Sequence, residues 1–258
     1  MLENVTNIIN DTLASGVEPL RRVYRGVYDG YDDAPIAYFT ETELFLTATG
    51  VMKDYVAAIE NNDTGRRWSL SNIAAAYRAL QQFAAREKKA AFVTAHVTKS
   101  FLEGDVQGDL TKLIEQGILA EGVVLAFSES AVLGNQKASA GVAAARAMGF
   151  GAAICGFSAK ESLSSIVAAP VDYLFFDESM TALSGDRDKP GVFTALTALL
   201  RTLRCSIVLC GVGSDDTIRE ATAAECFGIM PSDSYEGEFN FPKGGQTMEE
   251  ILSEEGAQ

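Results

Sequence analysis

The stretch Gly149–Asp177 constrains the fold more than any other part of the sequence. Gly151–Ile154 is a short run of small and apolar residues, which predicts a buried strand. A polar turn and a short helix near Ser162–Ala168 follow, and Pro170 ends that helix because its ring forbids continuation. Val171–Phe176 is a second apolar run and predicts a second strand. A strand, a crossover and a strand indicate a βαβ unit, which implies a parallel sheet.

The remaining sequence alternates predicted strands and helices with short connections. The polar turn DGYDDAP joins two strands into an antiparallel hairpin at the start. This order favours one closed α/β barrel, since an open doubly wound sheet would need a Gly-rich phosphate loop that the sequence lacks. The further predicted strands are Val23–Tyr28, Ile36–Phe45, Ala91–Val97, Val123–Phe127, Ser206–Cys210 and Phe227–Met230. The further predicted helices are Met52–Glu60, Trp68–Arg86, Val106–Gln116, Ala138–Met148, Val192–Leu203, Asp215–Ala223 and Met248–Glu254, with Asn61–Thr64 as a polar break.

An amphipathic helix is predicted before the first strand, with Gly16 as its stop. Its apolar stripe consists of Val5, Ile8, Ile9, Thr12 and Leu13. We therefore predict residues 1–20 as an N-terminal helix. Residues 21–258 are predicted as one barrel domain that includes a C-terminal helical tail.

Composition limits the classes of partner. The 258-residue chain is 47% apolar, has a net charge of −14 and has an isoelectric point near 4.5. An acidic chain argues against a nucleic-acid or anionic-membrane surface, because both require a basic face. The four cysteines show no paired spacing, which favours reduced thiols, and no apolar run approaches the length of a membrane span. A soluble cytoplasmic protein is expected.

The Gly149–Asp177 stretch resembles the EAL family of cyclic di-GMP phosphodiesterases, whose corresponding segment ends in LPVDYLKID. Phe157, the serines that follow it, Pro170–Leu174 and Asp177 fit that pattern. The resemblance covers about Tyr24 to Pro242. It implies the fold class α/β, as a single TIM-like (β/α)8 barrel of EAL type with an antiparallel first strand. It also implies a site for Mg²⁺ or Mn²⁺ at the carboxyl ends of the strands, which activates water for attack on phosphorus.

The family's metal-binding residues and lysine are replaced at the matched positions. The Glu of the Glu-Ala-Leu motif falls on Thr40, and the nucleotide-binding Arg that follows falls on Leu44. A slip of one or three residues would offer Glu41 or Glu43 instead. A one-residue slip would turn the side chains to the other face of the strand, so it is not favoured. The other matched positions are His96 for Asn, Ala126 for Glu, Cys155 and Gly156 for two Asp, Phe175 for Lys, Cys210 and Gly213 for two Glu, and Met230 near the final Gln. These residues cannot assemble the oxygen coordination that Mg²⁺ requires, so no catalytic residue, metal or cofactor is expected.

Several of these residues have two interpretations. His96, Cys155 and Cys210 could form a soft ligand set for Zn²⁺, but buried core residues are favoured. Glu129 and Asp177 are retained acids, either remnants of catalysis or helix caps. Arg25 could meet a phosphate or could lie on the surface of its strand, and Phe175 is expected to fill the space of the missing lysine.

Three functions remain open. The first is a non-catalytic regulatory module that binds a protein in bacterial cyclic di-GMP signalling. The second is a sensor that binds cyclic di-GMP or another nucleotide without cutting it, and the third is a hydrolase with an altered metal site. The expected partner is a protein of open identity, with homodimer formation also open and with neither nucleic acid nor membrane as a partner.

Overall fold

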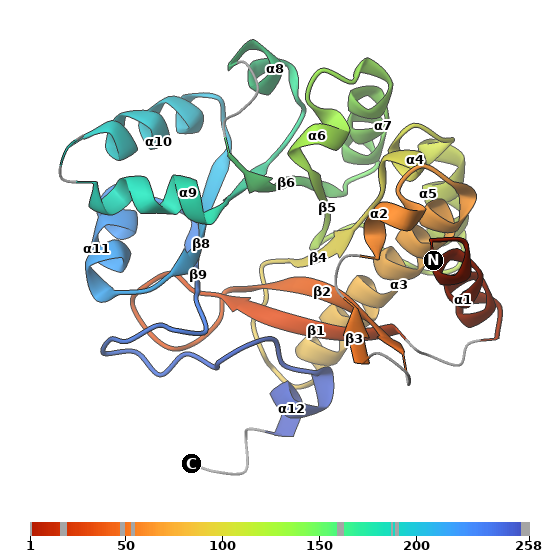
Figure 1. Ribbon diagram of the computed structural model, residues 1–258, viewed down its shortest axis with the longest axis horizontal. Helices are drawn as coiled ribbons and strands as arrows, with labels where there is room; N and C mark the ends of the chain where they lie inside the picture. The colour runs from red at the N-terminus through yellow and green to blue at the C-terminus, as the bar shows by residue number, and fades with distance from the viewer. Residues whose placement is uncertain are drawn as a thin grey trace.

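A computed structural model of the chain describes residues 2–15, 20–46, 50–52, 55–158, 163–186, 188 and 191–253. Gly16, Ser162 and Glu254, which were predicted helix boundaries, lie outside these residues. Figure 1 shows the strands enclosing a barrel with the helices outside it. The strands are β1 (Leu20–Val27), β2 (Ala37–Leu46), β3 (Gly50–Met52), β4 (Val93–His96), β5 (Val123–Ser128), β6 (Gly151–Phe157), β7 (Tyr173–Phe176), β8 (Ser206–Val212) and β9 (Gly228–Pro231).

The strands follow the order predicted for a TIM-like barrel with a reversed first strand, and that prediction is confirmed. The hydrogen-bonded path runs β1-β2-β4-β5-β6-β7-β8-β9, with β3 paired to β2 outside it. Strands β1 and β2 are antiparallel, and the pairs from β2–β4 to β8–β9 are parallel. The barrel closes where Tyr28 and Ile229 exchange backbone hydrogen bonds of 2.9 and 2.8 Å. Because the ends of all parallel strands meet at one edge, this closure creates a single opening at their carboxyl ends.

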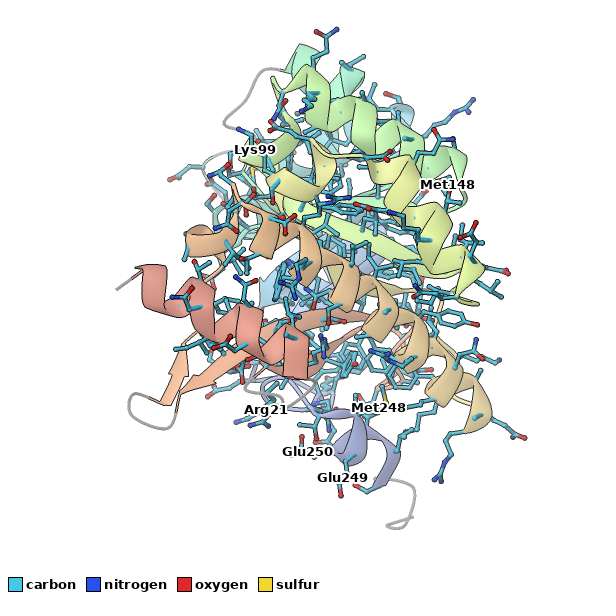
Figure 2. The ribbon with its side chains drawn as sticks, turned by 90° about the vertical axis from the view of Figure 1, so that its right-hand side faces the viewer. Arg21, Lys99, Met148, Met248, Glu249 and Glu250 are labelled. Carbon is cyan, nitrogen blue, oxygen red and sulfur yellow. The ribbon has the colours of Figure 1, made fainter. Side chains whose placement is uncertain are left out.

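Helices cover the outside of the barrel. Seen from the side in Figure 2, α1, α3, α5 and α7 form one layer over the strands. Helix α1 is amphipathic as predicted, and its Val5 and Ile9 are buried in a cluster with Leu20 and Trp68. The helices are α1 (Leu2–Ser15), α2 (Val56–Ile59), α3 (Asp63–Ala85), α4 (Lys99–Leu102), α5 (Val106–Glu115), α6 (Glu129–Val132), α7 (Gln136–Ala147), α8 (Leu163–Ala168), α9 (Glu178–Thr181), the 3-10 helix η1 (Ala182–Gly185), α10 (Val192–Thr202), α11 (Asp215–Ala223) and α12 (Met248–Ser253).

Two predicted helix boundaries were wrong. Helix α3 begins at Asp63 rather than Trp68, because Asn62 caps it by accepting a hydrogen bond from the Gly65 amide. Of the predicted break Asn61–Thr64, Asp63 and Thr64 therefore lie in the first turn of the helix and Asn62 is its cap. Met52 lies in strand β3 rather than in a helix, since it pairs with Leu44 of β2.

Two strands extend beyond their predicted ends through irregular pairing. Strand β6 continues past Ile154 to Phe157, and its register shifts between these residues. Gly156 has φ +65°, a conformation that favours glycine, so the strand bends without ending. Strand β8 similarly runs past Cys210, with Gly211 at φ +73°.

Side chains alternate between two packed layers along each strand. One set faces the helices and forms the main core, which includes Tyr38, Leu125, Leu174 and Leu209. The other set fills the barrel interior. It comprises Val27, Ala37, Phe92, Val124, Ala153, Phe175, Val208 and Met230, with Ile36, Phe39, Cys155, Tyr173, Cys210 and Phe227 packed against them.

No helix among the described residues is both long and apolar enough to cross a membrane.

Candidate functional site

The opening at the carboxyl ends of the parallel strands is called the mouth here. Interior-facing residues at or after the strand ends surround it, as the alternation of each strand requires. These are Glu41 on β2, His96 on β4, Cys155 on β6, Asp177 after β7 and Cys210 on β8, together with Arg25 on the reversed strand β1.

Thr40 and Leu44 do not face the mouth. Tyr38 stacks on Phe83 of α3, with ring centroids 4.3 Å apart, and Leu44 is buried among residues of α1 and α3. Thr40 lies between Tyr38 and Leu44 on the same face of β2, because alternate residues of a strand point the same way. Its side chain therefore faces the helices. The neighbouring residue Glu41 faces the interior instead. It is the residue that a one-residue shift of the alignment, not favoured from the sequence, would have placed at the family's Glu. The assignment of the family's Glu to Thr40 and its Arg to Leu44 is therefore corrected.

Arg25 lies in the mouth but is held by two carboxylates. Its Nε donates to Glu41 Oε1 over 2.9 Å, and its Nη1 donates to Asp233 Oδ1 over 2.8 Å. Burial alone would lower the pKa of Arg25, but the hydrogen bond that it donates to Asp233 and the charge of Glu41 raise it. Arg25 is thus fully charged, and a phosphate ligand would have to compete with both acids.

Aromatic side chains close the interior below the mouth. Phe175 is 1% exposed, and its ring lies 5.1 Å from that of Phe39 and 6.4 Å from that of Phe92. The imidazole of His96 meets Phe39 edge-on with centroids 5.0 Å apart. Ala126, opposite His96 on β5, is fully buried. Where the family resemblance implies a lysine and carboxylates, the interior is therefore mostly apolar.

The two retained acids make local hydrogen bonds. Asp177 caps α9 by accepting from the Met180 amide (2.9 Å) and from the Ser179 hydroxyl (2.6 Å). Glu129 Oε2 accepts from the amide and the hydroxyl of Ser158, at 2.9 and 2.8 Å. The capping interpretation of Asp177 is supported by this geometry, and Glu129 ties the end of β5 to the end of β6. Its Oε1 is buried without a hydrogen-bond partner.

The donor groups at the mouth do not fit a metal. Among the residues that the structure describes, no group of three or more His, Cys, Asp or Glu side chains is arranged to hold a metal ion. Burial raises the pKa of Cys210 to about 12, with a contribution from Asp177, and burial with the neighbouring Cys210 raises that of Cys155. Both are therefore neutral thiols near pH 7, whereas a metal binds the thiolate. Gly156 and Gly213 offer no side-chain donor, so these two matched positions supply no ligand for Mg²⁺ or Zn²⁺.

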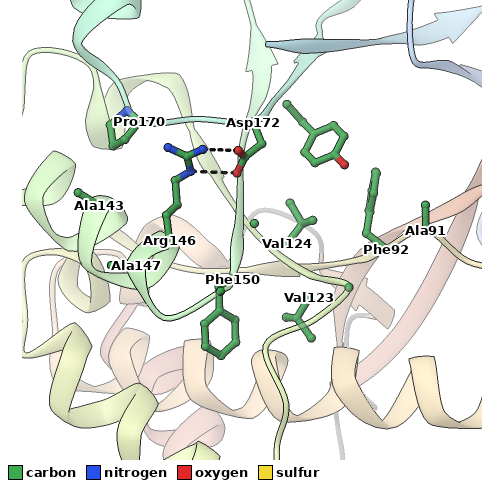
Figure 3. A pocket seen from close by; sticks show the side chains of 14 residues that line it. Ala91, Phe92, Val123, Val124, Ala143, Arg146, Ala147, Phe150, Pro170 and Asp172 are labelled. Atoms are coloured by element: carbon green, nitrogen blue, oxygen red, sulfur yellow. Dashed lines mark hydrogen bonds and ion pairs between the residues drawn. The ribbon is translucent and has the colours of Figure 1, made fainter. Parts of the chain in front are cut away.

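A larger cavity, of about 650 Å³, lies at the opposite end of the barrel. Figure 3 shows its lining, in which the guanidinium of Arg146 meets the carboxylate of Asp172 through two parallel bonds. Asp172 Oδ2 also accepts from the buried amide of Ala152, at 2.9 Å. Asp172, which matches the family's Val-Asp-Tyr pattern, therefore joins the starts of β6 and β7 and has a structural role at this end.

Replacing Asp172 with alanine is expected to lower the free energy of unfolding by about 1–3 kcal/mol, because the Ala152 amide and Arg146 lose their acceptor. Urea denaturation measures the change. Asp216→Ala is the matched control, since Asp216 also pairs with an arginine but is exposed on α11, and it should change stability little. Equal losses in the two variants would contradict this role for Asp172.

Sequence reasoning missed Trp68, which lines a smaller cavity together with Glu41 and Glu43, the two acids that a shifted alignment would offer. The sequence of β2 gives no signal for the face on which these acids lie, because Tyr38 and Phe39 on opposite faces of the strand are both apolar and packed.

Known proteins with the same architecture were found by sequence and by structure. The EAL domain matches residues 17–230 of the chain, and no curated protein matches it. An EAL domain protein from Listeria monocytogenes superposes with a TM-score of 0.73 at 16% identity, covering 97% of this chain and 96% of that one. The EAL domain of Mycobacterium smegmatis DcpA gives 0.68 at 18% identity, covering 91% and 96%. The phosphodiesterase PaMucR, in complex with c-di-GMP, also gives 0.68 at 18%, covering 87% and 94%.

These superpositions show that the chain shares its fold with these proteins. The sequence match extends from before β1 into β9, as far as Met230, and so reaches every strand of the barrel path. The chain belongs to the EAL domain family.

Proposed function

We propose that this EAL domain is non-catalytic and acts as a regulatory module that binds a protein partner in bacterial cyclic di-GMP signalling, in the cytoplasm. The observation that carries the proposal is the character of the mouth. Phe175 and Ala126 occupy interior positions at which the family resemblance implies a lysine and an oxygen ligand of a metal-dependent phosphodiesterase. The free thiols of all four cysteines are consistent with a reducing compartment.

The charge of the mouth supports the same proposal. Glu41, Asp177 and Asp233 contribute negative charge, and the guanidinium of Arg25 is shared by two of these acids. Phosphate recognition favours an arginine that offers both of its donors, or a metal. A cyclic dinucleotide with two phosphates would therefore be poorly compensated here.

Calorimetric titration with cyclic di-GMP tests the proposal. We expect a dissociation constant weaker than about 100 μM, or little more than about 5.5 kcal/mol of binding free energy, with and without Mg²⁺. No linear dinucleotide product should accumulate when Mn²⁺ is added, because the metal-activated hydroxide and the charge stabilisation lack their residues.

Two results would favour the other functions. A low-micromolar dissociation constant that is lost in Arg25→Ala, but kept in Arg219→Ala on the exposed face of α11, would establish a cyclic di-GMP sensor. A linear product that persists after the protein is repurified would establish a hydrolase with an altered site.

A further inference from the structure

Helix α10 presents apolar side chains to the solvent. The helix packs against β8 and η1, and Phe193, Thr197 and Leu200 on its inner face are buried. On its outer face, Val192 is 43% exposed and Leu199 is 41% exposed. These two residues are close to two full helical turns apart, so their side chains lie on the same side of the helix.

Val192, Ala195 and Leu199 form what we call the α10 stripe. Ala195 lies between the two larger residues and is also exposed. Spacings of three and four residues are those of a packed helix face. The other large apolar residues that are exposed in the described part of the chain stand on separate elements, as single exposed residues commonly do. They are Tyr31, Ile114, Leu119 and Val167. The α10 stripe is therefore the exposed apolar feature that indicates a surface for association.

Helix α10 carries no acid, although the chain is strongly acidic. The chain has 35 Asp and Glu residues and a net charge of −14. Between Val192 and Thr202 the one charged residue is Arg201, and it pairs with Glu225. Two copies of so acidic a chain repel each other, and the repulsion is weakest where the facing elements carry no acids. The α10 stripe thus offers a second copy an approach without facing carboxylates.

The stripe is also complementary to itself. When two copies of α10 lie antiparallel and are centred between Ala195 and Leu196, Val192 of each copy lies opposite Leu199 of the other. Ala195 lies at the centre, where its small side chain lets the two helices approach closely. The antiparallel arrangement also places the positive end of each helix dipole beside the negative end of the other. A two-fold dimer requires such self-complementarity, because it uses the same patch on both partners.

We infer that the α10 stripe is the contact between two copies of this chain in a symmetric dimer. An 11-residue helix is about 16 Å long, so its face is smaller than the roughly 800 Å² per partner of a standard interface. The dimer is therefore weak, with an expected Kd of about 10–100 μM. The inference goes beyond the proposed function, because α10 lies outside the barrel wall and contributes no side chain to the mouth (Figure 1).

Sedimentation equilibrium of the pure chain tests the inference, over concentrations from about 5 to about 300 μM that bracket this Kd. The apparent mass should rise from 27.5 kDa toward twice that value. Raising the salt from about 20 to about 300 mM should tighten the dimer about two- to fivefold, because screening reduces the repulsion between two acidic copies. An interface held by ion pairs would weaken instead, and that response would contradict an apolar contact.

Variants assign the association to the stripe. Leu199→Glu places a carboxylate against an apolar side chain twice in the symmetric dimer, and it should weaken association at least about tenfold. Leu119→Glu is the matched control, since Leu119 is 55% exposed in the loop after α5 and should change nothing. Figure 1 shows α5 and α10 on opposite sides of the barrel. Val192→Glu should repeat the effect of Leu199→Glu and keeps the test decisive if Leu199→Glu fails to fold.

Cross-linking tests the antiparallel geometry. Ala195→Cys lies beside the two-fold axis, so oxidation with copper phenanthroline should join two copies through a disulfide. Thr202→Cys should not join them, because the two copies of residue 202 lie at opposite ends of the helix pair. The unchanged protein, with its four cysteines, measures the background on a non-reducing gel.

Three results would overturn the inference. A single species of 27.5 kDa over the whole concentration range would show that the stripe does not pair two copies. A dimer that both Leu199→Glu and Val192→Glu leave intact would use another face. Equal cross-linking of the Ala195→Cys and Thr202→Cys variants would contradict the antiparallel arrangement.

Discussion

Replacing Phe175 with alanine is expected to lower the free energy of unfolding by about 3–5 kcal/mol. Phe175 is 1% exposed and lies inside the barrel, in ring contact with Phe39 and Phe92. Truncation removes the buried ring and leaves a cavity that the closed wall of strands cannot collapse to fill. Urea denaturation followed by circular dichroism at 25 °C measures the loss.

The matched control for this prediction is Tyr31→Ala. Tyr31 is also aromatic but is 74% exposed in the loop between β1 and β2, so its truncation should change stability little. A third variant, Phe175→Lys, restores the residue that the family resemblance implies at this position. It should be at least as destabilising as alanine, because the ammonium would enter an apolar interior without an assigned carboxylate partner. A change of less than about 1 kcal/mol in Phe175→Ala would show that the ring does not fill the interior.

The fold was accessible from the sequence because buried parallel strands appear as continuous apolar runs. Val123–Phe127 and Val171–Phe176 were recognised in this way, and the structure places β5 and β7 there. The boundary of α3 was missed because an asparagine serves equally well in a loop and as a helix cap. Only the hydrogen bond from the Gly65 amide to Asn62 distinguishes the two.

The face of β2 was harder to predict for a physical reason. Both faces of this strand are covered, one by helices and one by the barrel interior, so Tyr38 and Phe39 are both buried or nearly so. Hydrophobic alternation cannot then decide which residues point inward, and Thr40 was assigned in place of Glu41. The contact of Leu44 with α1 resolves the parity, and it is a tertiary contact.

The partners of Arg25 and the pairing of β2 with β4 depend on tertiary structure even more strongly. Asp233 lies 208 positions after Arg25, and barrel closure brings the two together. Strands β2 and β4 share a single residue pair, and this register is invisible in either strand alone. Sequence reasoning could therefore identify what the mouth lacks, but not what its remaining charges contact.

Stability is expected to fall as the pH drops from about 6.5 to about 4, by up to about 3 kcal/mol from His96 alone. Burial lowers the pKa of His96 from 6.5 to about 4, so the folded protein keeps the imidazole neutral where the unfolded chain protonates it. The unfolded state thus binds more protons in this window, and the stabilisation present above pH 6.5 is lost as the pH falls toward 4. At pH 5 about 2 kcal/mol of it should already be gone.

A comparison of the wild type with His96→Gln isolates the contribution of His96, since it is the only histidine of the chain. The unfolding free energy of the wild type and of His96→Gln is measured by urea denaturation at pH 7.5 and pH 5.0. Titration of the many carboxylates is common to both proteins and cancels in the comparison. The glutamine variant should lose about 2 kcal/mol less than the wild type between the two pH values, whatever its absolute stability. Parallel losses in the two proteins, or an imidazole NMR titration midpoint near 6.5, would show that the imidazole of His96 is solvated in the folded protein.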